Sequence, residues 1–376
     1  MIYLDSAATS LYKPSGVAAA VAGAINAMAS PGRGSHTPAM RAAECCYLCR
    51  ERIAELFHVP RVENVVFTFN ATHGLNIAIR SVVRPGARVL ISGWEHNAVT
   101  RPLHALGATE LVIDTPLFDP AAFLREAEAN LPRADAVVCT HVSNVFGYIL
   151  PVEGLARLCR RYGKPLIVDA SQSAGVLGLD FAALGADFVA MPGHKGLLGP
   201  QGTGVLLCKN DARPLLYGGS GSESVDQDMP AFLPDRLEAG THNVAGIAGL
   251  SAGVAWILGK GLDTVRAIEQ ERLRALAAAL SGIEGLRLFY APGDGVQAGV
   301  LSVLPEGLDC EALGEALNEY GVCVRTGLHC APLAHKSAGT LATGTVRFSV
   351  SPFNTRAQID RAGEICGEIL RKTPKF

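Results

Sequence analysis

The strongest constraint on the fold of this chain is a series of short apolar runs that alternate with helical patterns. The runs have strand length, are bounded mostly by Gly, Pro and polar residues, and cover residues 65–69, 88–92, 136–140, 165–169, 188–191 and 202–208. Helical segments lie between several of them, for example at 155–162. This alternation predicts an α/β fold with a large, mainly parallel sheet that is flanked by helices.

The length of the chain and a change of pattern predict two domains. With 376 residues, the chain is too long for one ordinary core. After the Gly-Ser-rich stretch 218–222 the strand–helix alternation stops, and the last part of the chain has the pattern of a smaller α+β unit. We expect a large domain at residues 16–251 and a smaller α+β domain built from residues 1–15 and 252–376.

Composition and charge argue against several classes of protein. The formal net charge is −2 without a basic stripe, which argues against a nucleic-acid partner. The N-terminus does not have the pattern of a signal peptide, and the apolar stretch 244–259 is too short and too rich in glycine for a membrane span. The ten cysteines show no paired metal spacing, and Cys45, Cys46 and Cys49 share a helical pattern that favours packing. We expect a cytoplasmic protein with no metal site and no membrane contact.

Polar residues gather where the predicted strands end. In an open α/β sheet, ligands bind outside the carboxyl ends of the strands, so side chains at these ends face one crevice. The residues at such positions are Thr72, His96, Asn144, Asp169, Gln172, His194 and Lys195. So many polar strand ends in succession predict a binding site at this edge of the sheet.

Asp169 and Lys195 follow two consecutive strands, and this pair suits pyridoxal 5'-phosphate (PLP) chemistry. A lysine forms the Schiff base with this cofactor, and an acid keeps its pyridinium nitrogen protonated. Taken singly, each residue has a simpler explanation, a helix-capping Asp or a surface Lys. The hypothesis therefore depends on the other residues of the predicted crevice.

The segment 70–76 has the pattern of an anion site. A strand leads through a small polar turn into a helix, whose first N–H groups have no partners within the helix and point outward. Thr72 can add a hydroxyl group. The alternative is an ordinary helix N-cap.

The loop around Cys330 is a second chemical focus. The run 321–326 has strand character and leads into Gly327-Leu328-His329-Cys330, and Pro332 follows. A loop bounded by Gly and Pro cannot easily bury Cys330, and an exposed loop cysteine near cationic groups is typical of a nucleophilic thiolate. The alternative is a buried structural cysteine, which is what we expect for Cys139 and Cys208.

Arg347 lies between apolar neighbours in the strand-like run 345–351. A buried arginine needs an anionic partner, because an unpaired buried charge is very costly. A substrate carboxylate, held by two hydrogen bonds, is one candidate. A structural Asp or Glu of the protein is the other.

These residues, in this order and spacing, resemble a known family. The motifs are Tyr3–Thr9, Arg33–His36, Glu95-His96, Ser143-Asn144, Asp169–Gln172, Gly193–Lys195, Glu238–Thr241 and Arg325–Ala331. Over nearly its full length the chain resembles the class V aminotransferase group of fold-type I PLP enzymes, and within it the cysteine desulfurases and selenocysteine lyases. The resemblance implies a fold-type I PLP-dependent transferase with the cofactor in the large domain.

The resemblance implies roles for the residues of the cofactor site. Lys195 would bind PLP covalently and later move protons at the substrate carbon, and Asp169 would pair with the ring nitrogen. His96 would stack on the ring, a contact that contributes about 1 kcal/mol beyond burial. A neutral lysine is needed for proton transfer, and the cationic ring is expected to lower its pKa. The remaining cofactor ligands would be Asn144 and Gln172 at the phenolic oxygen, and Thr72, His73 and His194 at the phosphate.

The same resemblance implies a reaction and its substrate contacts. Cys330 would attack the sulfur of L-cysteine, which leaves L-alanine and a persulfide on Cys330 for transfer to an acceptor protein. Arg347 would bind the substrate carboxylate, and Arg325 would support the substrate or the loop. Asn144 and His36 would be further substrate contacts.

In the family, the residue that matches Thr241 reaches the phosphate from the other subunit, so the resemblance implies a homodimer with shared sites. Two features depart from the family pattern. Many relatives have Ser or Thr at the position of Pro192, where this chain has no side-chain donor for the phosphate. The tract 333–344 fits well-studied desulfurases poorly, and it borders Cys330.

Three alternatives to a cysteine desulfurase follow from these observations. The first is a selenocysteine lyase, because the poorly fitting tract borders the predicted nucleophile. The second is another class V lyase or aminotransferase that acts on a different amino acid. The third is a non-catalytic scaffold with the same fold, but such a protein would be expected to lose Lys195 or Asp169, and both are present.

Overall fold

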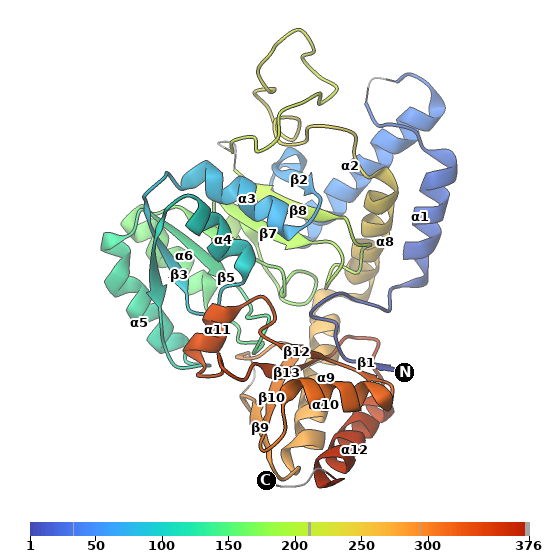
Figure 1. Cartoon of the computed structure of the whole chain (residues 1–376). Helices are drawn as coiled ribbons and strands as arrows, with labels where there is room; N and C mark the ends of the chain where they lie inside the picture. The colour runs from blue at the N-terminus through green and yellow to red at the C-terminus, as the bar shows by residue number, and fades with distance from the viewer. Residues whose placement is uncertain (33, 210–211, 294, 373–376) are drawn as a thin grey trace.

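A seven-stranded sheet lies at the centre of the structure (Figure 1), a computed structural model that describes residues 1–32, 34–209, 212–293 and 295–372. In spatial order its strands are β2 (Val65–Thr68), β8 (Gly204–Cys208), β7 (Phe188–Pro192), β6 (Leu166–Asp169), β5 (Ala136–Thr140), β3 (Arg88–Ser92) and β4 (Thr109–Ile113). Only β8 runs antiparallel to its neighbours. The predicted mainly parallel sheet is confirmed, and β4 is a strand that the sequence analysis did not predict.

Both faces of this sheet are buried because helices cover them. Successive residues of a strand point to opposite faces. Val138 and Ile167 therefore pack in one cluster with α3 and α4, whereas Val137 and Val168 pack in another with α5 and α6. These helices are α3 (Ala71–Val82), α4 (Asn97–Ala105), α5 (Pro120–Asn130) and α6 (Val152–Tyr162), and shorter elements are η1 (Val62–Asn64), η2 (Leu131–Arg133) and α7 (Phe181–Leu184).

Three helices stand together beside the sheet (Figure 1): α1 (Ser15–Ala27), α2 (Thr37–Phe57) and α8 (Val244–Lys260). Arg50 of α2 forms a buried ion pair with Glu238 at 2.6 Å, and Glu238 also accepts the N–H of Phe67 at 2.7 Å. Burial alone would raise the pKa of Glu238, but Arg50 and His242 hold this pKa at about 2. The long segment after β8 is thereby fastened to β2.

A second, antiparallel sheet forms the C-terminal part of the structure. Its strands, in spatial order, are β12 (Arg325–Gly327), β13 (Thr345–Ser349), β10 (Val300–Pro305) and β9 (Leu286–Phe289). The helices of this part are α9 (Leu262–Ser281), α10 (Cys310–Glu319), α11 (Pro332–Ser337) and α12 (Arg356–Lys372). The first strand of the chain, β1 (Ile2–Tyr3), pairs with β11 (Val322–Cys323), so the N-terminus belongs to this part.

The proposed division into residues 16–251 and residues 1–15 with 252–376 remains a prediction. The boundary after residue 251 falls within α8, a continuous helix that packs against α1 and α2. Among the described residues, no single helix is long and apolar enough to cross a membrane. Only α8 and α9 taken together reach that length and composition, and an 87° bend separates them.

A close backbone contact positions the loop that follows β7. Gly253 of α8 lies against this loop, and a Cβ atom at Gly253 would approach the carbonyl oxygen of Leu197 to 2.4 Å. Real side chains cannot occupy that space, so the absence of a side chain at Gly253 allows the helix to support the segment that begins at Lys195.

We expect Gly253→Ala to lower the free energy of unfolding by about 1–3 kcal/mol, because the added methyl group forces the helix away from the loop. The matched control is Gly259→Ala in the same helix, where a Cβ atom would meet nothing within 4 Å. That control should be neutral or raise stability by up to about 1 kcal/mol. Urea denaturation of both variants tests this, and equal stability of the two would contradict the packing argument.

Candidate active site

A cavity of about 230 Å³ lies at the carboxyl edge of the large sheet. Loops that follow β2, β3, β5, β6 and β7 supply most of its walls. All seven polar residues at the predicted strand ends line it, namely Thr72, His96, Asn144, Asp169, Gln172, His194 and Lys195. The structure therefore brings these side chains together, as expected when parallel strands end at one edge.

Asp169 and Lys195 come from neighbouring parallel strands, since Asp169 at the end of β6 pairs with Ala190 of β7. Asp169 is buried, and its Oδ1 accepts the N–H of Ser171 at 2.9 Å. Burial, opposed by Asp169 and aided by Arg347, lowers the pKa of Lys195 to about 8. The lysine can therefore lose its proton near neutral pH without any help from a bound cofactor.

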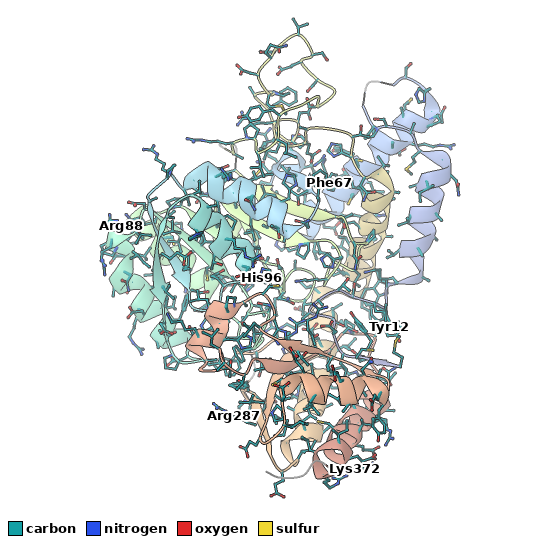
Figure 2. The ribbon with its side chains drawn as sticks, in the orientation of Figure 1. Tyr12, Phe67, Arg88, His96, Arg287 and Lys372 are labelled. Carbon is teal, nitrogen blue, oxygen red and sulfur yellow. The ribbon has the colours of Figure 1, made fainter. Side chains whose placement is uncertain are left out.

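His96 is fixed as the N-cap of α4. Its Nδ1 accepts the N–H of Ala98 at 3.0 Å, which leaves the proton of the neutral ring on Nε2. Burial lowers the pKa of His96, so the neutral form is favoured. Figure 2 shows His96 between the large sheet and the C-terminal part, where it lines the cavity.

One end of the cavity has the features of an anion site. Thr72 lies in the first turn of α3, which Asn70 caps by accepting the N–H of His73 at 2.9 Å. His194 borders the same cavity, and its Nδ1 lies 3.0 Å from Oγ1 of Thr9. Burial lowers the pKa of His194 to about 4, so its ring is neutral and contributes hydrogen bonds rather than charge.

His73 and Pro192 differ from the other residues at this end. His73 does not line the cavity, because its ring stacks on Phe69 at a centroid distance of 4.8 Å. Its Nε2 is buried and has no hydrogen-bond partner. Pro192 lines the cavity without offering a donor, so the donors available at this end are backbone N–H groups and the side chains of Thr72 and His194.

Gln172 and Asn144 connect the cavity to distant segments. Gln172 donates from Nε2 to the carbonyl oxygen of Ala7 at 3.0 Å. Asn144 donates from Nδ2 to the carbonyl oxygen of His329 at 2.8 Å, and its buried Oδ1 has no partner. A buried polar atom without a partner is rare in proteins, and this one belongs to a residue that lines the cavity.

Cys330 is exposed, as predicted from its loop. The loop lies against the active site, because the carbonyl oxygen of Cys330 accepts the N–H of Asn97 at 2.8 Å, next to His96. His329 and Cys330 both have a positive φ, 50° and 56°, a backbone conformation that residues other than glycine rarely adopt. The thiol is thus presented to solvent beside the cavity by a tightly constrained turn.

The histidine before Cys330 does not supply positive charge. His329 is buried, its Nε2 lies 3.2 Å from Oγ1 of Thr345, and its ring lies 5.6 Å from that of His335. Burial lowers the pKa of His329 to about 2 and that of His335 to about 4. Both rings are neutral, so cationic groups near the thiol must come from other residues.

Arg347 has an acidic partner within the chain, as in the second of the two alternatives from the sequence, a structural Asp or Glu. Its Nη2 lies 2.9 Å from Oδ1 of Asp5, and its Nη1 donates to the carbonyl oxygen of Asn144 at 3.0 Å. Arg325 reaches the other oxygen of Asp5 at 3.2 Å. Asp5 was not assigned a role from the sequence, because a contact across 342 positions leaves no local pattern.

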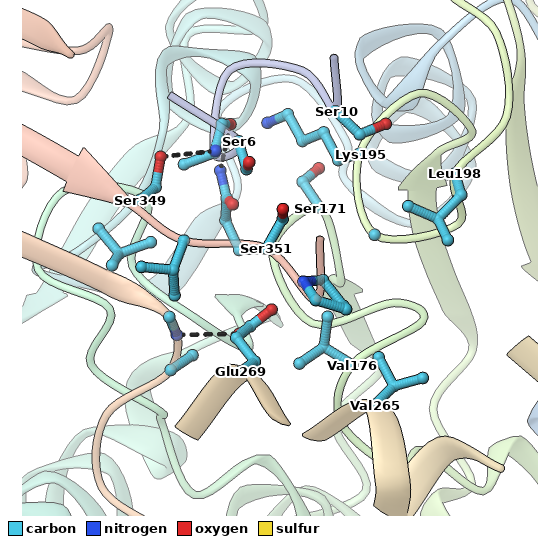
Figure 3. A pocket seen from close by; sticks show the side chains of 18 residues that line it. Ser6, Ser10, Ser171, Val176, Lys195, Leu198, Val265, Glu269, Ser349 and Ser351 are labelled. Carbon is cyan, nitrogen blue, oxygen red and sulfur yellow. Dashed lines mark hydrogen bonds between the residues drawn. The ribbon is translucent and has the colours of Figure 1, made fainter. Parts of the chain in front are cut away.

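Glu269 is a second residue that the sequence analysis missed. It lines a smaller cavity of about 50 Å³ that shares Gln172 and Lys195 with the first, and Figure 3 shows it on the side opposite Lys195. It accepts the N–H of Gly299 at 2.9 Å, and burial raises its pKa to about 7. Glu269 lies in the charged, alanine-rich helix α9, and its sequence context does not distinguish it from the exposed acidic residues nearby.

Two remaining predicted residues, His36 and Thr241, lie away from the cavity in this chain. His36 is exposed and caps α2, and Thr241 is exposed in the segment before α8. Arg33, from the same motif as His36, lies outside the described residues. Within the described ranges, no three His, Cys, Asp or Glu side chains are grouped so that they could hold a metal ion.

The fold and the cavity together define an α/β enzyme of the fold-type I transferase class. The family model Aminotransferase class-V matches residues 2–362, and the chain belongs to this family. A probable cysteine desulfurase from Methanothermobacter thermautotrophicus is 33% identical, over 98% of this chain and 94% of the relative. A probable cysteine desulfurase from Mycolicibacterium paratuberculosis is 32% identical over 87% of this chain, and the match spans 49% of that longer protein.

A solved structure supports the same assignment. The apo structure of a cysteine desulfurase from Thermococcus onnurineus NA1 superposes with a TM-score of 0.92. It is 30% identical in sequence, and the match covers 99% of this chain and 95% of that one. The agreement extends over both sheets and is not limited to the large domain.

Glu95, next to His96, should make stability depend on pH. Its Oε1 accepts hydrogen bonds from Ser92 and from the N–H of Thr140, but its Oε2 is buried without a partner. Burial raises the pKa of Glu95 from 4.5 to about 8, although these hydrogen bonds oppose the shift. A raised acid pKa stabilises the fold fully below pH 4.5, and that stability is lost as the pH rises through 8.

We therefore expect Glu95→Gln to gain stability relative to the unmodified protein as the pH rises from 5.5 to about 8. The measurement is urea denaturation of both proteins without added cofactor at several pH values. Comparing the two proteins at each pH cancels the contributions of other titrating groups. A difference that stays constant over this range would contradict the buried, protonated state of Glu95.

Proposed function

We propose that this protein is a PLP-dependent cysteine desulfurase, which converts L-cysteine to L-alanine and forms a persulfide on Cys330. The observation that carries the proposal is the placement of an exposed, loop-borne thiol beside a cavity that contains Lys195 and Asp169. Two hydrogen bonds, from Asn144 and from Asn97, hold the loop at the cavity. The names of similar proteins support the same reaction.

The residues at the cavity fit PLP. A lysine with a lowered pKa, an acid, an imidazole ring and a helix N-terminus match the aldehyde, the ring nitrogen, the ring face and the phosphate of this cofactor. The partnerless Oδ1 of Asn144 supports the proposal that a polar group of the ligand binds at this wall. The lack of a donor at Pro192 is offset by Thr72 and His194.

Each residue then has a defined task. Lys195 binds the cofactor, Asp169 accepts the hydrogen bond of the ring nitrogen, and His96 covers one ring face. The phenolic oxygen is bound by Asn144 and Gln172, and the phosphate by Thr72, His73 and His194. Turning toward the phosphate would require His73 to leave Phe69, and its partnerless Nε2 supports this role.

When bound, PLP supplies an electron sink that stabilises negative charge at the substrate α-carbon. Lys195 then takes and returns the α-proton, which a pKa of about 8 permits near neutral pH. Sγ of Cys330 attacks the substrate sulfur, so that one S–S bond forms and the C–S bond breaks. The electron pair of the broken C–S bond stays with the substrate Cβ, which takes up the proton that the Cys330 thiol loses. The transferred sulfur keeps its own hydrogen, so the products are alanine and the persulfide Cys330–SSH.

Five further proposals complete this picture. The large domain at residues 16–251 binds the cofactor, and the smaller domain carries Arg347, Arg325 and Cys330. The protein is a homodimer in which the exposed Thr241 reaches the partner's phosphate, and His36 contributes to substrate binding. An acceptor protein takes the sulfur from the exposed Cys330. The protein acts in the cytoplasm.

Replacement of Lys195 by Ala should abolish the absorption band that PLP gives when it is linked to a lysine, because no other amine of the described chain lines the cavity. Spectrophotometric titration with PLP measures this. Lys209→Ala is the control. It removes an exposed lysine that directly follows β8 and does not line the cavity, so this variant should keep the band. An unchanged band in Lys195→Ala would refute the cofactor assignment.

Cys330→Ala should still bind PLP and L-cysteine. It should form no persulfide, and its rate of alanine release should fall at least a hundredfold, because the atom that accepts the sulfur is gone. Cys45→Ala, at another partly exposed cysteine, should keep full activity. Alanine release from L-cysteine and from L-selenocysteine is measured for all three proteins. Selenide release that persists in Cys330→Ala, with no activity on cysteine in any of them, would favour a selenocysteine lyase instead.

A further inference from the structure

Asp5 shares its carboxylate between two arginines at the proposed substrate site. Oδ1 lies 2.9 Å from Nη2 of the buried Arg347, and Oδ2 lies 3.2 Å from Nε of Arg325, whose side chain is 53% exposed. All three side chains act electrostatically on Lys195, because Arg347 and Arg325 lower its pKa whereas Asp5 raises it. Arg347 also donates to the carbonyl oxygen of Asn144, a residue that lines the cavity, so the cluster lies beside the cavity.

The position of Asp5 is fixed by its backbone. The neighbouring Leu4 accepts the N–H of Ser349 at 2.7 Å, and Ala7 donates to Oγ of Ser349 at 2.9 Å. The hydroxyl of Tyr3 donates to the carbonyl oxygens of Asp5 and Thr9, at 3.1 and 2.8 Å. The carboxylate is thus a preorganised part of the site and not a mobile surface group.

Arg347 keeps a free donor for a ligand. Its Nη1 is used by the carbonyl oxygen of Asn144 and its Nη2 by Asp5, but its Nε is buried and has no hydrogen-bond partner. A buried donor of this kind is costly unless a ligand completes it. Nε is therefore the guanidinium nitrogen that neither Asp5 nor Asn144 occupies.

The charges of the cluster do not cancel. Two arginines and one aspartate leave a single uncompensated positive charge, which one substrate carboxylate neutralises. A substrate with a second anionic group would bring an excess negative charge close to Asp5, where burial weakens the screening by water.

We propose that Asp5 determines substrate specificity by setting the charge of this site, so that an amino acid with one carboxylate and an uncharged side chain is preferred to one with a second acidic group. The inference rests on the proposed function, in which Arg347 binds the substrate carboxylate. It assigns to Asp5 the selection against acidic side chains, and to Arg325 the opposite effect.

The test compares two variants that change the charge in opposite directions, Asp5→Asn and Arg325→Gln. Calorimetry measures the binding of L-alanine and L-aspartate to each protein, with and without added PLP. Asp5→Asn should shift the ratio of the two dissociation constants toward aspartate, on the order of tenfold, and Arg325→Gln should shift it toward alanine. Asp360→Asn, which removes an exposed carboxylate from its ion pair with Arg356, carries the same charge change as Asp5→Asn and should leave the ratio unchanged.

The inference is overturned if both variants weaken both amino acids equally, since Asp5 and Arg325 would then only support the structure. It is also overturned if the ratio does not move, or if neither amino acid binds to the unmodified protein. Arg325→Gln tests the charge rule even if Asp5→Asn fails to fold, because Arg325 is exposed. A failure to bind PLP would contradict the proposed function, whereas the comparison without PLP still reports on Asp5.

Discussion

The cost of burying charge governs how this structure is built where its two sheets meet. Arg347 is buried only because Asp5 pairs with it, and Glu95 is accommodated because its carboxyl group stays protonated at neutral pH. The same burial brings the pKa of Lys195 to about 8 and keeps the nearby histidines neutral. One physical effect thus makes the lysine competent for proton transfer and fixes which neighbours can carry charge.

The parts of the site that the sequence predicted are those with local causes. A short apolar run followed by polar residues shows directly where a strand ends, and parallel strands end at a common edge, so Asp169, Lys195 and His96 could be placed together. The motif order added the family, which the whole-chain match confirms. The roles of the individual side chains remain predictions.

The parts that the sequence did not predict depend on distant contacts or on backbone geometry. Nothing near Asp5 indicates that its partner lies 342 positions away, and the rotation of His73 onto Phe69 depends on local packing. The histidine before Cys330 suggested a cationic neighbour. Instead, the left-handed backbone at His329 turns its ring into the core, where burial removes the charge. For the two histidines the residue type was recognised, but the direction of the side chain was not.

The pairing of β1 with β11 has a consequence for the order in which the protein can assemble. During synthesis, the large sheet and the cavity around Lys195 have all of their strands once β8 is made. The first residues must wait for β11 and β13 before Ile2 can pair with Val322 and Asp5 with Arg347. The contacts of the N-terminal segment are therefore completed last, so a chain that stops short of β11 would retain all strands of the large sheet around Lys195 while β1 has no strand to join.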